Sequence, residues 1–311
     1  MNLLEAMRYL AALEQHRHFG RAAQACHITQ PALSNAVRAL EAEFGVTIVR
    51  RGRQYEGLTP EGSRVLETAH RMLHERETLN QELRGLEGEP QGRLSIGAVP
   101  TATPIASRFA AWLQARNVGI VPVVRSLSSA AIEEGIENLS LDLAFGYGDR
   151  ASKRSAHFAV LAQYVEHYFV LRRTAGRQRR IGAPMRWKAA SELPLCMLTP
   201  EMHNRWIVDA SFAAAGAEVR PAIETNSVIT LVLSVLAGEV CSVLPGALVA
   251  IALQYPELEA LPLIEPHVVT PIGMLSASSG RLSLAQKAAI NLAGDADWLA
   301  HAASHSGPLL P

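Results

Sequence analysis

Residues 19–51 limit the fold of this chain more than any other segment, because they have the pattern of two short helices joined by a tight turn. The first helix is expected from Gly20 to Ala25, where small side chains allow another helix to approach closely. The second is expected to begin at Thr29, whose hydroxyl can cap a helix, with a proline in its first turn, where the missing amide hydrogen has no partner anyway. This helix-turn-helix pattern is typical of proteins that read DNA.

The second helix separates apolar from polar side chains around its axis. Its apolar residues recur at three- and four-residue spacing and predict a buried stripe; they are Ala32, Leu33, Ala36, Val37 and Leu40. The outward residues are Gln30, Ser34, Asn35 and Arg38. Amide side chains pair with adenine edges, Arg with guanine and Ser with either, so this face fits major-groove readout. An ordinary solvated helix face is the alternative.

A short basic segment follows this helix. Gly45 is expected to end the helix, and a hairpin with several arginines is expected between Val46 and Pro60, where it can contact phosphates or the minor groove. Between Arg17 and Arg53 the acidic residues are Glu41 and Glu43 alone, so the local charge is positive. The predicted DNA-binding residues are Arg21, Thr29, Gln30, Pro31, Ser34, Asn35, Arg38, Arg50, Arg51 and Arg53.

The run ITQPALSNAVRALEAEFG, followed by the basic hairpin and by LTPEG, resembles the winged helix-turn-helix of the LysR-type transcriptional regulators. Chain length and the order of later segments also match, so the resemblance covers nearly the whole chain. It implies that the helix from Thr29 to Phe44 enters the major groove of double-stranded DNA and that the wing lies over the adjacent backbone. Ile48 and Val49 stand where the family more often has Leu-Phe, which is a packing variant.

Residues 61–89 have a continuous helical pattern without proline. An apolar stripe with alternating steps of four and three predicts a partner helix, and it consists of Val65, Ala69, Met72, Leu79, Leu83 and Leu86, interrupted by Arg76. Packing on its own domain is the alternative, but the GEPQG linker that follows favours dimerisation. The resemblance implies antiparallel pairing of two such helices in a homodimer or homotetramer whose reading heads bind an inverted repeat.

From Arg93 onward strand and helix patterns alternate, which predicts a parallel sheet covered by helices. The expected strands include 93–99, 120–125 and 141–147, and the expected helices include 104–116, 128–137, 201–215 and 284–293. Residues 194–200, 219–226 and 268–276 are further segments of the same pattern, and a weakly ordered tail is expected at 303–311. The expected fold class is α/β: a winged helix-turn-helix (1–60), a linker helix (61–89) and an effector-binding domain (90–311). The resemblance implies two lobes folded like a periplasmic solute-binding protein, lobe I about 93–162 and 268–300, lobe II about 163–267.

Hydroxyl residues gather after the expected strands, where helix N-termini present free amide hydrogens to anions. We therefore expect a small effector, anionic rather than cationic, in a cleft between the lobes. Each hydroxyl taken alone fits an ordinary helix cap. The predicted effector contacts, several at positions where the resemblance places effector contacts, are Thr101, Thr103, Ser128, Ser129, Tyr147, Thr199, Met202, His203 and Asn226.

Membrane insertion and secretion have little support. The apolar stretch 228–253 is long enough for a spanning helix, but Glu239 and Pro245 favour a helix, a buried strand and a second helix instead. Glu5 and Arg8 interrupt the first apolar run, which lacks a cleavage site, so we expect a cytoplasmic protein. The formal net charge of +0 excludes no DNA reader, because one basic face suffices.

Catalysis also has little support. The sequence has no GxSxG, P-loop, GxGxxG or HExxH motif, and its eleven histidines lack metal-ligand spacing, so we expect no enzyme, no cofactor and no metal. The alternative is a solute-binding receptor or an enzyme without DNA-binding activity. Cys26, Cys196 and Cys241 form no CxxC pair and indicate a reducing compartment. Redox sensing would need a low-pKa thiol with a resolving partner.

Overall fold

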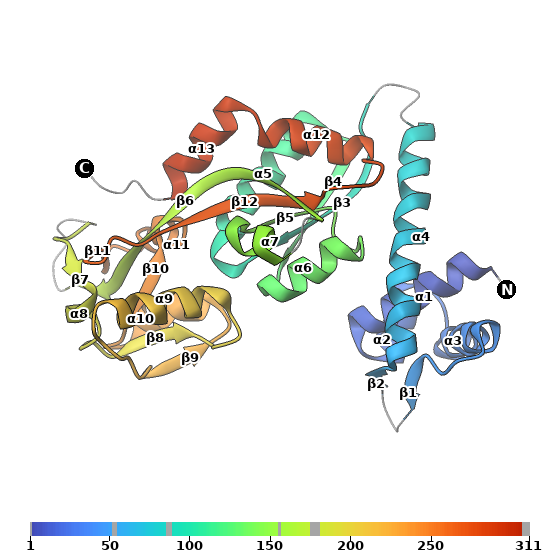
Figure 1. The fold of residues 1–311 in the computed structure, drawn as a ribbon, viewed down its shortest axis with the longest axis horizontal. Helices are drawn as coiled ribbons and strands as arrows, with labels where there is room; N and C mark the ends of the chain where they lie inside the picture. Colours follow the sequence, from blue (N-terminus) through green and yellow to red (C-terminus); the bar gives the residue numbers. More distant parts are fainter. Residues whose placement is uncertain (1, 52–54, 85–88, 155–156, 175–180, 307–311) are drawn as a thin grey trace. The chain divides into compact units, whose positions relative to one another are not determined.

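The computed structural model describes residues 2–51, 55–84, 89–154, 157–174 and 181–306, which form two compact units. One unit is built mainly from the chain up to Gly88, and the other mainly from the chain beyond it. The N-terminal unit contains, in chain order, α1 (Leu3–His16), α2 (Phe19–Ala25), α3 (Gln30–Phe44), β1 (Val49–Arg51), β2 (Tyr55–Leu58) and α4 (Pro60–Arg84) (Figure 1).

The helices of this unit close over one apolar core. Leu10 and Leu13 of α1 and Leu33 and Leu40 of α3 have no exposed surface, because their three- and four-residue spacing places them on one side of each helix. Ala22 of α2 is equally buried, and its small side chain lets the neighbouring helix approach closely. The predicted helix pair is confirmed.

The ends of α3 follow the expected capping chemistry. The Thr29 hydroxyl accepts a hydrogen bond from the amide of Ala32 at 3.3 Å, which satisfies one free donor of the first turn. Gly45 ends the helix at a φ of 65°, a left-handed conformation that glycine adopts without a Cβ clash. The predicted start and end of the helix are therefore confirmed.

The base of the wing is anchored to α3 and α4. The Glu41 carboxylate accepts hydrogen bonds from the amides of Ile48 at 3.0 Å and Val49 at 3.3 Å. The Thr59 hydroxyl donates to the Thr47 carbonyl at 2.6 Å and accepts from the amide of Gly62 at 2.9 Å. These bonds fix where the antiparallel strands β1 and β2 leave the helical core.

Gly62 of α4 packs tightly against the backbone of Ile48, just before β1. A Cβ atom on Gly62 would lie 2.1 Å from the carbonyl oxygen of Ile48, far inside van der Waals contact. The glycine of the LTPEG run is therefore required by a backbone contact.

We expect Gly62→Ala to lower the stability of the N-terminal unit by about 1–3 kcal/mol, because the added methyl group must push α4 away from β1. Hydrogen exchange of peptides from residues 2–84 measures this local opening. Glu67→Ala, at an exposed position of the same helix, is the matched control. Equal exchange of the Gly62→Ala and control proteins would contradict the steric argument.

The second unit is built on a mixed sheet flanked by helices (Figure 1). Its strands are β3 (Gly92–Ala98), β4 (Ile120–Ser126), β5 (Leu143–Tyr147), β6 (Phe158–Arg173), β7 (Met185–Arg186), β8 (Leu195–Leu198), β9 (Ile223–Thr225), β10 (Cys241–Pro245), β11 (Leu258–Ile264) and β12 (Val269–Ala277). Its helices are η2 (Pro100–Ala102), α5 (Thr103–Arg116), α6 (Ser129–Glu137), α7 (Gly148–Arg154), α8 (Trp187–Ala190), α9 (His203–Ala214), α10 (Val228–Ala237), α11 (Gly246–Ala252), α12 (Leu284–Ala293) and α13 (Ala296–Ser306).

Two lobes share this sheet, whose order is β4-β3-β5-β12-β6-β10-β8-β9; β11 also pairs with β6, and β7 pairs with β11. In the first lobe β4, β3 and β5 run parallel over a core that includes Phe109, Phe145 and Trp298. In the second lobe apolar side chains from α8 and α9 pack on one face of the sheet, and those from α10 and α11 on the other. The expected two-lobed α/β architecture is confirmed.

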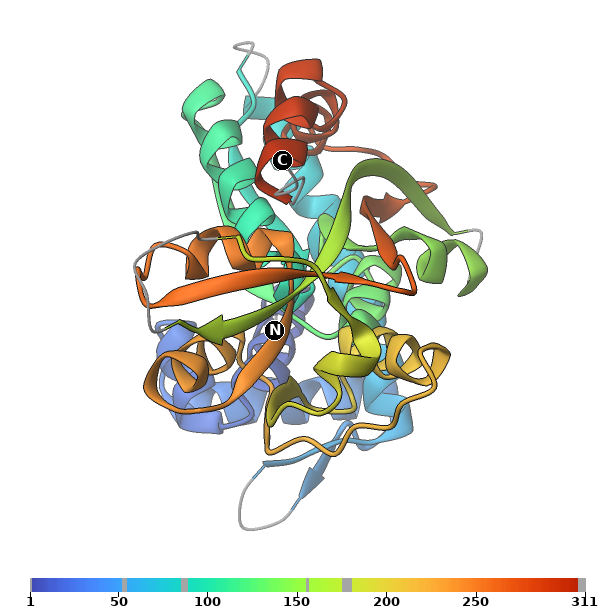
Figure 2. The same cartoon turned by 90° about the vertical axis from the view of Figure 1, so that its left-hand side faces the viewer.

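The lobes are joined by the long strand β6, which belongs to both. Its first part pairs antiparallel with β12 from Phe158 to His167, and its second part pairs with β10 and β11 from Tyr168 onward. Figure 2 shows β6 and β12 passing side by side between the two groups of helices. The sheet is therefore mixed, whereas the strand and helix alternation predicted a parallel one.

Two expectations for the later segments have different outcomes. The stretch 228–253 forms helix, buried strand and helix as predicted, and no helix among the described residues is long and apolar enough to cross a membrane. The expectation of a weakly ordered tail is wrong for residues 303–306, because α13 continues to Ser306, which is buried together with Ala302. The rest of that tail lies outside the described residues.

Candidate DNA-binding surface and effector site

The side chains predicted for base readout lie on the solvent face of α3. Gln30, Asn35 and Arg38 are exposed, and Ser34 is half-buried, while the opposite face of the helix fills the core. The other predicted DNA-binding residues with described side chains are also exposed: Arg21, Thr29, Pro31 and Arg50. The Arg51 side chain and Arg53 lie outside the described residues.

The charges of the arginines on this surface are not neutralised by neighbouring carboxylates of the described residues. Within the described part of the unit, Arg21, Arg38 and Arg50 form no ion pair with another side chain, whereas Arg8 of α1 and Arg17 just after it pair with glutamates of α1. A guanidinium without a carboxylate partner is available for a phosphate or a guanine.

The second unit contains a cavity of about 620 Å³ with walls from both lobes. The first lobe contributes Tyr147 and the charged residues Asp149, Arg150 and Lys153 around α7, and the second lobe contributes His203 and Trp206 of α9. Residues 268–271 of the crossover close one side. Because β5 pairs with β12 only from Ile272 onward, this stretch of β12 has an open edge that the cavity occupies.

The charged wall of the cavity combines Arg150 and Lys153 with Asp149, and it is anchored to α6. The Arg150 Nε donates to Oε1 of Glu133 at 2.6 Å, and this glutamate on α6 is buried with 2% of its surface exposed. Lys153 is exposed and forms no ion pair with a described residue, so its ammonium group is available to a ligand. Burial, and after it the positive charge of Arg150, lowers the pKa of His203. His203 is therefore uncharged at neutral pH.

Aromatic rings line the α9 side of the cavity. The His203 ring meets Tyr147 edge-on with centroids 4.8 Å apart, and it stacks on Trp206 at 5.4 Å with planes 11° apart. Trp206 keeps 64% of its surface exposed. The wall is thus apolar with one neutral imidazole, which suits the body of a small organic molecule.

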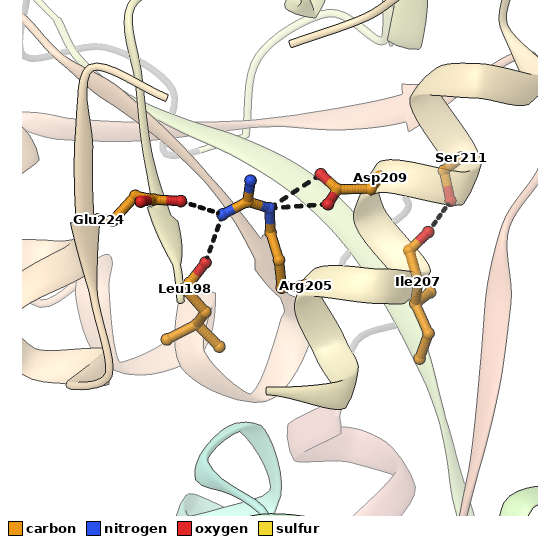
Figure 3. Close-up of polar contacts among 6 residues, drawn as sticks. All are labelled: Leu198, Arg205, Ile207, Asp209, Ser211 and Glu224. Carbon is orange, nitrogen blue, oxygen red and sulfur yellow. Dashed lines mark hydrogen bonds and ion pairs between the residues drawn. The ribbon is translucent and has the colours of Figure 1, made fainter. Parts of the chain in front are cut away.

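Arg205 fixes α9 against the strands of the second lobe (Figure 3). Its Nε donates to both carboxylate oxygens of Asp209 at 2.9 Å, and its Nη1 donates to the Leu198 carbonyl at 2.8 Å and to Oε1 of Glu224 at 2.6 Å. These bonds join α9 to β8 and β9. They hold the residues before and after Arg205 in place within the second lobe.

A buried polar cluster lies beside the cavity, and we call it the inner cluster. Every member has at most 8% of its surface exposed; the members are Thr101, Tyr147, Tyr164, Glu166, Tyr168, Asn204 and Thr270. The Thr101 and Tyr147 hydroxyls are hydrogen-bonded at 3.2 Å, and the Tyr168 and Thr270 hydroxyls at 2.9 Å. The Asn204 amide donates to the Tyr168 hydroxyl at 3.5 Å.

Glu166 is the exception in this cluster. Its side chain has no exposed surface, and neither carboxyl oxygen forms a hydrogen bond with a described residue; the hydroxyl of Tyr164 is also without a partner. Burial raises the pKa of Glu166 to about 8, because desolvation of the charged form outweighs the favourable effect of the nearby Thr101 hydroxyl. The carboxyl is mostly protonated at neutral pH.

Comparison with known proteins places this architecture in one family. Residues 87–297 match the LysR substrate binding domain, and residues 4–63 match the bacterial regulatory helix-turn-helix protein of the LysR family. The first match alone covers more than half of the chain. The chain belongs to the LysR family.

Individual relatives match this LysR regulator over different spans. A hydrogen peroxide-inducible genes activator of Pectobacterium carotovorum subsp. carotovorum is 41% identical over 105 residues, which is 33% of this chain and 34% of that protein. The match therefore spans about a third of the relative. The structure of a full-length OxyR variant from Pseudomonas aeruginosa covers 100% of this chain and 99% of its own at 23% identity and a TM-score of 0.66. Full-length CbnR with its target DNA covers 96% and 99% at 18% identity and a TM-score of 0.65. At these identities the likeness concerns the fold.

The predicted effector residues of this LysR regulator have three different locations. Tyr147 and His203 line the cavity, and Thr101 lies directly behind Tyr147. Three hydroxyls are engaged locally: Thr103 donates to the Val99 carbonyl, Ser128 accepts from the Ala131 amide and Thr199 donates to Glu201. The remaining residues are buried Ser129, half-buried Met202 and exposed Asn226. None of these last six is part of the cavity wall.

Sequence reasoning missed the residues that the crossover strands bring to the site. Tyr164, Glu166 and Tyr168 lie at every second position of the run YVEHY, which places all three on one face of β6. A glutamate between two tyrosines at strand spacing was a readable signal. Thr270 faces Glu166 across the β6–β12 register, a pairing that no local pattern reveals. Arg150 and Lys153 on α7 were likewise missed.

We expect Glu166→Gln to change how stability depends on pH. The folded-state pKa is raised, so the wild-type protein loses stability as pH rises from about 4.5 to about 8, by at most about 1.4 kcal/mol per pH unit, and the glutamine variant does not. The free energy of unfolding of the variant should therefore rise relative to that of the wild type across this window, and the difference between the two should stay constant above it.

Urea unfolding between pH 5 and pH 9 measures this difference. Tryptophan fluorescence reports on the second unit, because it contains all four tryptophans, Trp112, Trp187, Trp206 and Trp298. Glu134→Gln at an exposed position of α6 is the control and should follow the wild type at every pH. A pH-independent difference for Glu166→Gln would show that its carboxyl titrates normally.

Proposed function

We propose that this LysR-type regulator binds an inverted-repeat operator as a homo-oligomer and that a small effector between the two lobes alters operator binding or DNA bending. The observation that carries the proposal is the division of α3 into a buried apolar face and an exposed face with Gln30, Asn35 and Arg38. We infer that the protein acts in the cytoplasm and binds without catalysing a reaction, because the α3 surface and the cavity both have side chains suited to recognition.

Each part of the N-terminal unit has a separate role in this proposal. The α3 side chains read base edges in the major groove, with amides suited to adenine and Arg38 suited to guanine. Thr29 and Pro31 sit at the N-terminus of α3, whose positive dipole end favours a phosphate. Arg21 and Arg50 supply further phosphate contacts, and we assign the same role to Arg51 and Arg53. Binding of this kind weakens steeply with salt.

We expect Arg38→Ala and Ser34→Ala to weaken binding to a selected operator by about 1–3 kcal/mol each, with much smaller losses on random duplex. An operator obtained by selection from randomised duplexes, measured by fluorescence anisotropy at fixed salt, tests this expectation. Arg71→Ala on the exposed side of α4 removes the same charge and is the control. Equal losses on operator and random DNA would refute base readout by α3.

The linker helix α4 supports the oligomer. Ala69 is buried in the core of the N-terminal unit, but Met72, Leu79 and Leu83 further along are 37%, 51% and 59% exposed. Arg76, which interrupts the apolar stripe, lies 3.7 Å from the Glu5 carboxylate of α1. The apolar residues therefore remain as an uncovered stripe at helical spacing, which fits a second copy of the same helix. Leu86 of the predicted stripe lies outside the described residues.

We expect the double substitution Leu79→Asp and Leu83→Asp to convert the oligomer to monomer, because two carboxylates would be buried where apolar side chains meet. Sedimentation velocity of the full chain measures the change. The matched control is Glu67→Asp with Glu75→Asp on the exposed side of the same helix. If the apolar pair can be replaced without a change in sedimentation, α4 does not hold the oligomer.

The effector part of the proposal is supported by a cavity that both lobes line beside the crossover strands. A ligand that contacts α7 from one lobe and α9 from the other binds better to the arrangement that holds these helices at the right separation. Such a ligand shifts the population of lobe arrangements by the difference of its affinities for them. Of the predicted contacts, Tyr147, His203 and Thr101 are the ones best placed for this role.

Oxidation of a thiol is the other kind of signal to weigh, because several relatives carry the name of hydrogen peroxide-inducible genes activator. In this chain burial raises the pKa of Cys26, Cys196 and Cys241, so the reactive thiolate is disfavoured. Cys196 and Cys241 lie on neighbouring strands but belong to apolar clusters on opposite faces of the sheet. These observations favour a ligand over a disulfide as the signal.

A further inference from the structure

We propose that the inner cluster is the end of the effector site that holds an ammonium group, with Glu166 as its counterion, while Lys153 and Arg150 hold an anionic group at the other end. The effector would then be a small amino acid or another molecule with a primary amine and a carboxylate. This inference rests on the proposed function, because it specifies the ligand of the same cavity.

The first argument is the absence of partners. Glu166 and Tyr164 are adjacent on the inner face of β6, and the Glu166 oxygens and the Tyr164 hydroxyl have no hydrogen-bond partner among the described residues. Buried polar groups in folded proteins are nearly always paired with protein, water or a ligand. A carboxyl and a phenol without hydrogen bonds, side by side, indicate that a polar group of a bound ligand supplies the missing partner.

The second argument is the charge of that group. Three phenols lie close enough to Glu166 for its charge to affect them: Tyr147 of β5 and Tyr164 and Tyr168 of β6. Burial raises their pKa values most, and the Glu166 carboxyl raises them further. The other members, Thr101, Asn204 and Thr270, carry no charge. A ligand carboxylate placed here would meet an acid and no cation. An ammonium group would meet a carboxylate and aromatic rings, which both attract cations.

The third argument is continuity between the cluster and the cavity. Tyr147 and Thr270 belong to both, and Thr270 is the register partner of Glu166 on β12, so their side chains lie on the same face of the crossover. Lys153 and Arg150 line the cavity from α7. Glu166 itself is fully buried and is not part of the cavity wall, so the ammonium group of the ligand must pass Tyr147 and Thr270 to reach it, with the carbon chain along His203 and Trp206.

The binding step has a defined proton balance. The ligand amine enters as an ammonium ion and Glu166 is mostly protonated before binding, so formation of the ion pair transfers the Glu166 proton to the buffer. The pKa values of the three phenols beside Glu166 are raised above their ordinary value, so these phenols stay protonated at neutral pH. Net release of about one proton per bound ligand at pH 7 is therefore expected.

The experiment compares three series of probes on the full chain: ω-amino acids, ω-hydroxy acids and α,ω-dicarboxylic acids, each from three to eight carbons. Isothermal titration at pH 7 in buffers of different ionisation enthalpy gives affinity and proton release together. We expect the best ω-amino acid to bind at least about tenfold more tightly than its hydroxy and dicarboxylic counterparts, the size of a charge-assisted contact. Glu166→Gln should abolish both this preference and the proton release.

The controls separate this inference from the proposed function. Glu134→Gln should retain the preference, and Tyr164→Phe should reduce it without removing proton release. Dicarboxylic acids that bind as tightly as amino acids and weaken in Lys153→Ala would overturn the ammonium site but leave an anionic effector in the cavity. Binding by none of the probes, or an unchanged preference in Glu166→Gln, also overturns it. The proposed binding to an operator is tested by a separate measurement of DNA binding, so its failure is distinguishable from failure of the ammonium site.

Discussion

The antiparallel pairing of β6 with β12 is the interaction on which the second unit depends. These two strands carry the chain from one lobe to the other and back, and α11 of the second lobe also packs against α5 and α13 of the first. The pairing register also determines which side chains face each other at the crossing, including Glu166 and Thr270. A slip of one residue would turn Tyr164, Glu166 and Tyr168 to the opposite face and remove the inner cluster. Fold and site therefore depend on the same hydrogen bonds.

A buried carboxyl at this crossing has a cost that the rest of the fold does not reduce. Tyr147 bonds to Thr101 and Tyr168 to Thr270 instead of to the carboxyl, Tyr164 forms no hydrogen bond with a described residue, and no described cation is present in the cluster. The protein avoids the larger cost of a buried negative charge by keeping a proton on Glu166, which is why its pKa is near 8. A site with an unsatisfied acid at its centre is destabilised in the absence of ligand, and a group that satisfies it contributes correspondingly to binding.

Local patterns in the sequence predicted the helices well and the site only in part. The cap at Thr29, the glycine at the end of α3 and the bounds of α12 follow from spacing and capping chemistry, which act within a few residues. The effector hydroxyls Thr103, Ser128 and Thr199 were predicted from the same chemistry, and each is bonded close to its own position in the chain. Residues such as Glu166 and Thr270 meet through strand pairing more than 100 positions apart. Single-sequence periodicity contains no information about that pairing.

The two helices that face each other across the cavity are each fixed to their own lobe. Arg205 ties α9 to β8 and β9, and Arg150 ties α7 to buried Glu133 on α6. Neither helix can adjust to a ligand without breaking charge-assisted bonds, so a change in the distance between them requires the lobes to move as bodies about β6 and β12. A ligand that contacts both helices therefore acts on the crossover itself. Under the proposed function, this attachment would pass the binding of a small molecule on to the arrangement of the two lobes, because each helix is bonded to its own lobe.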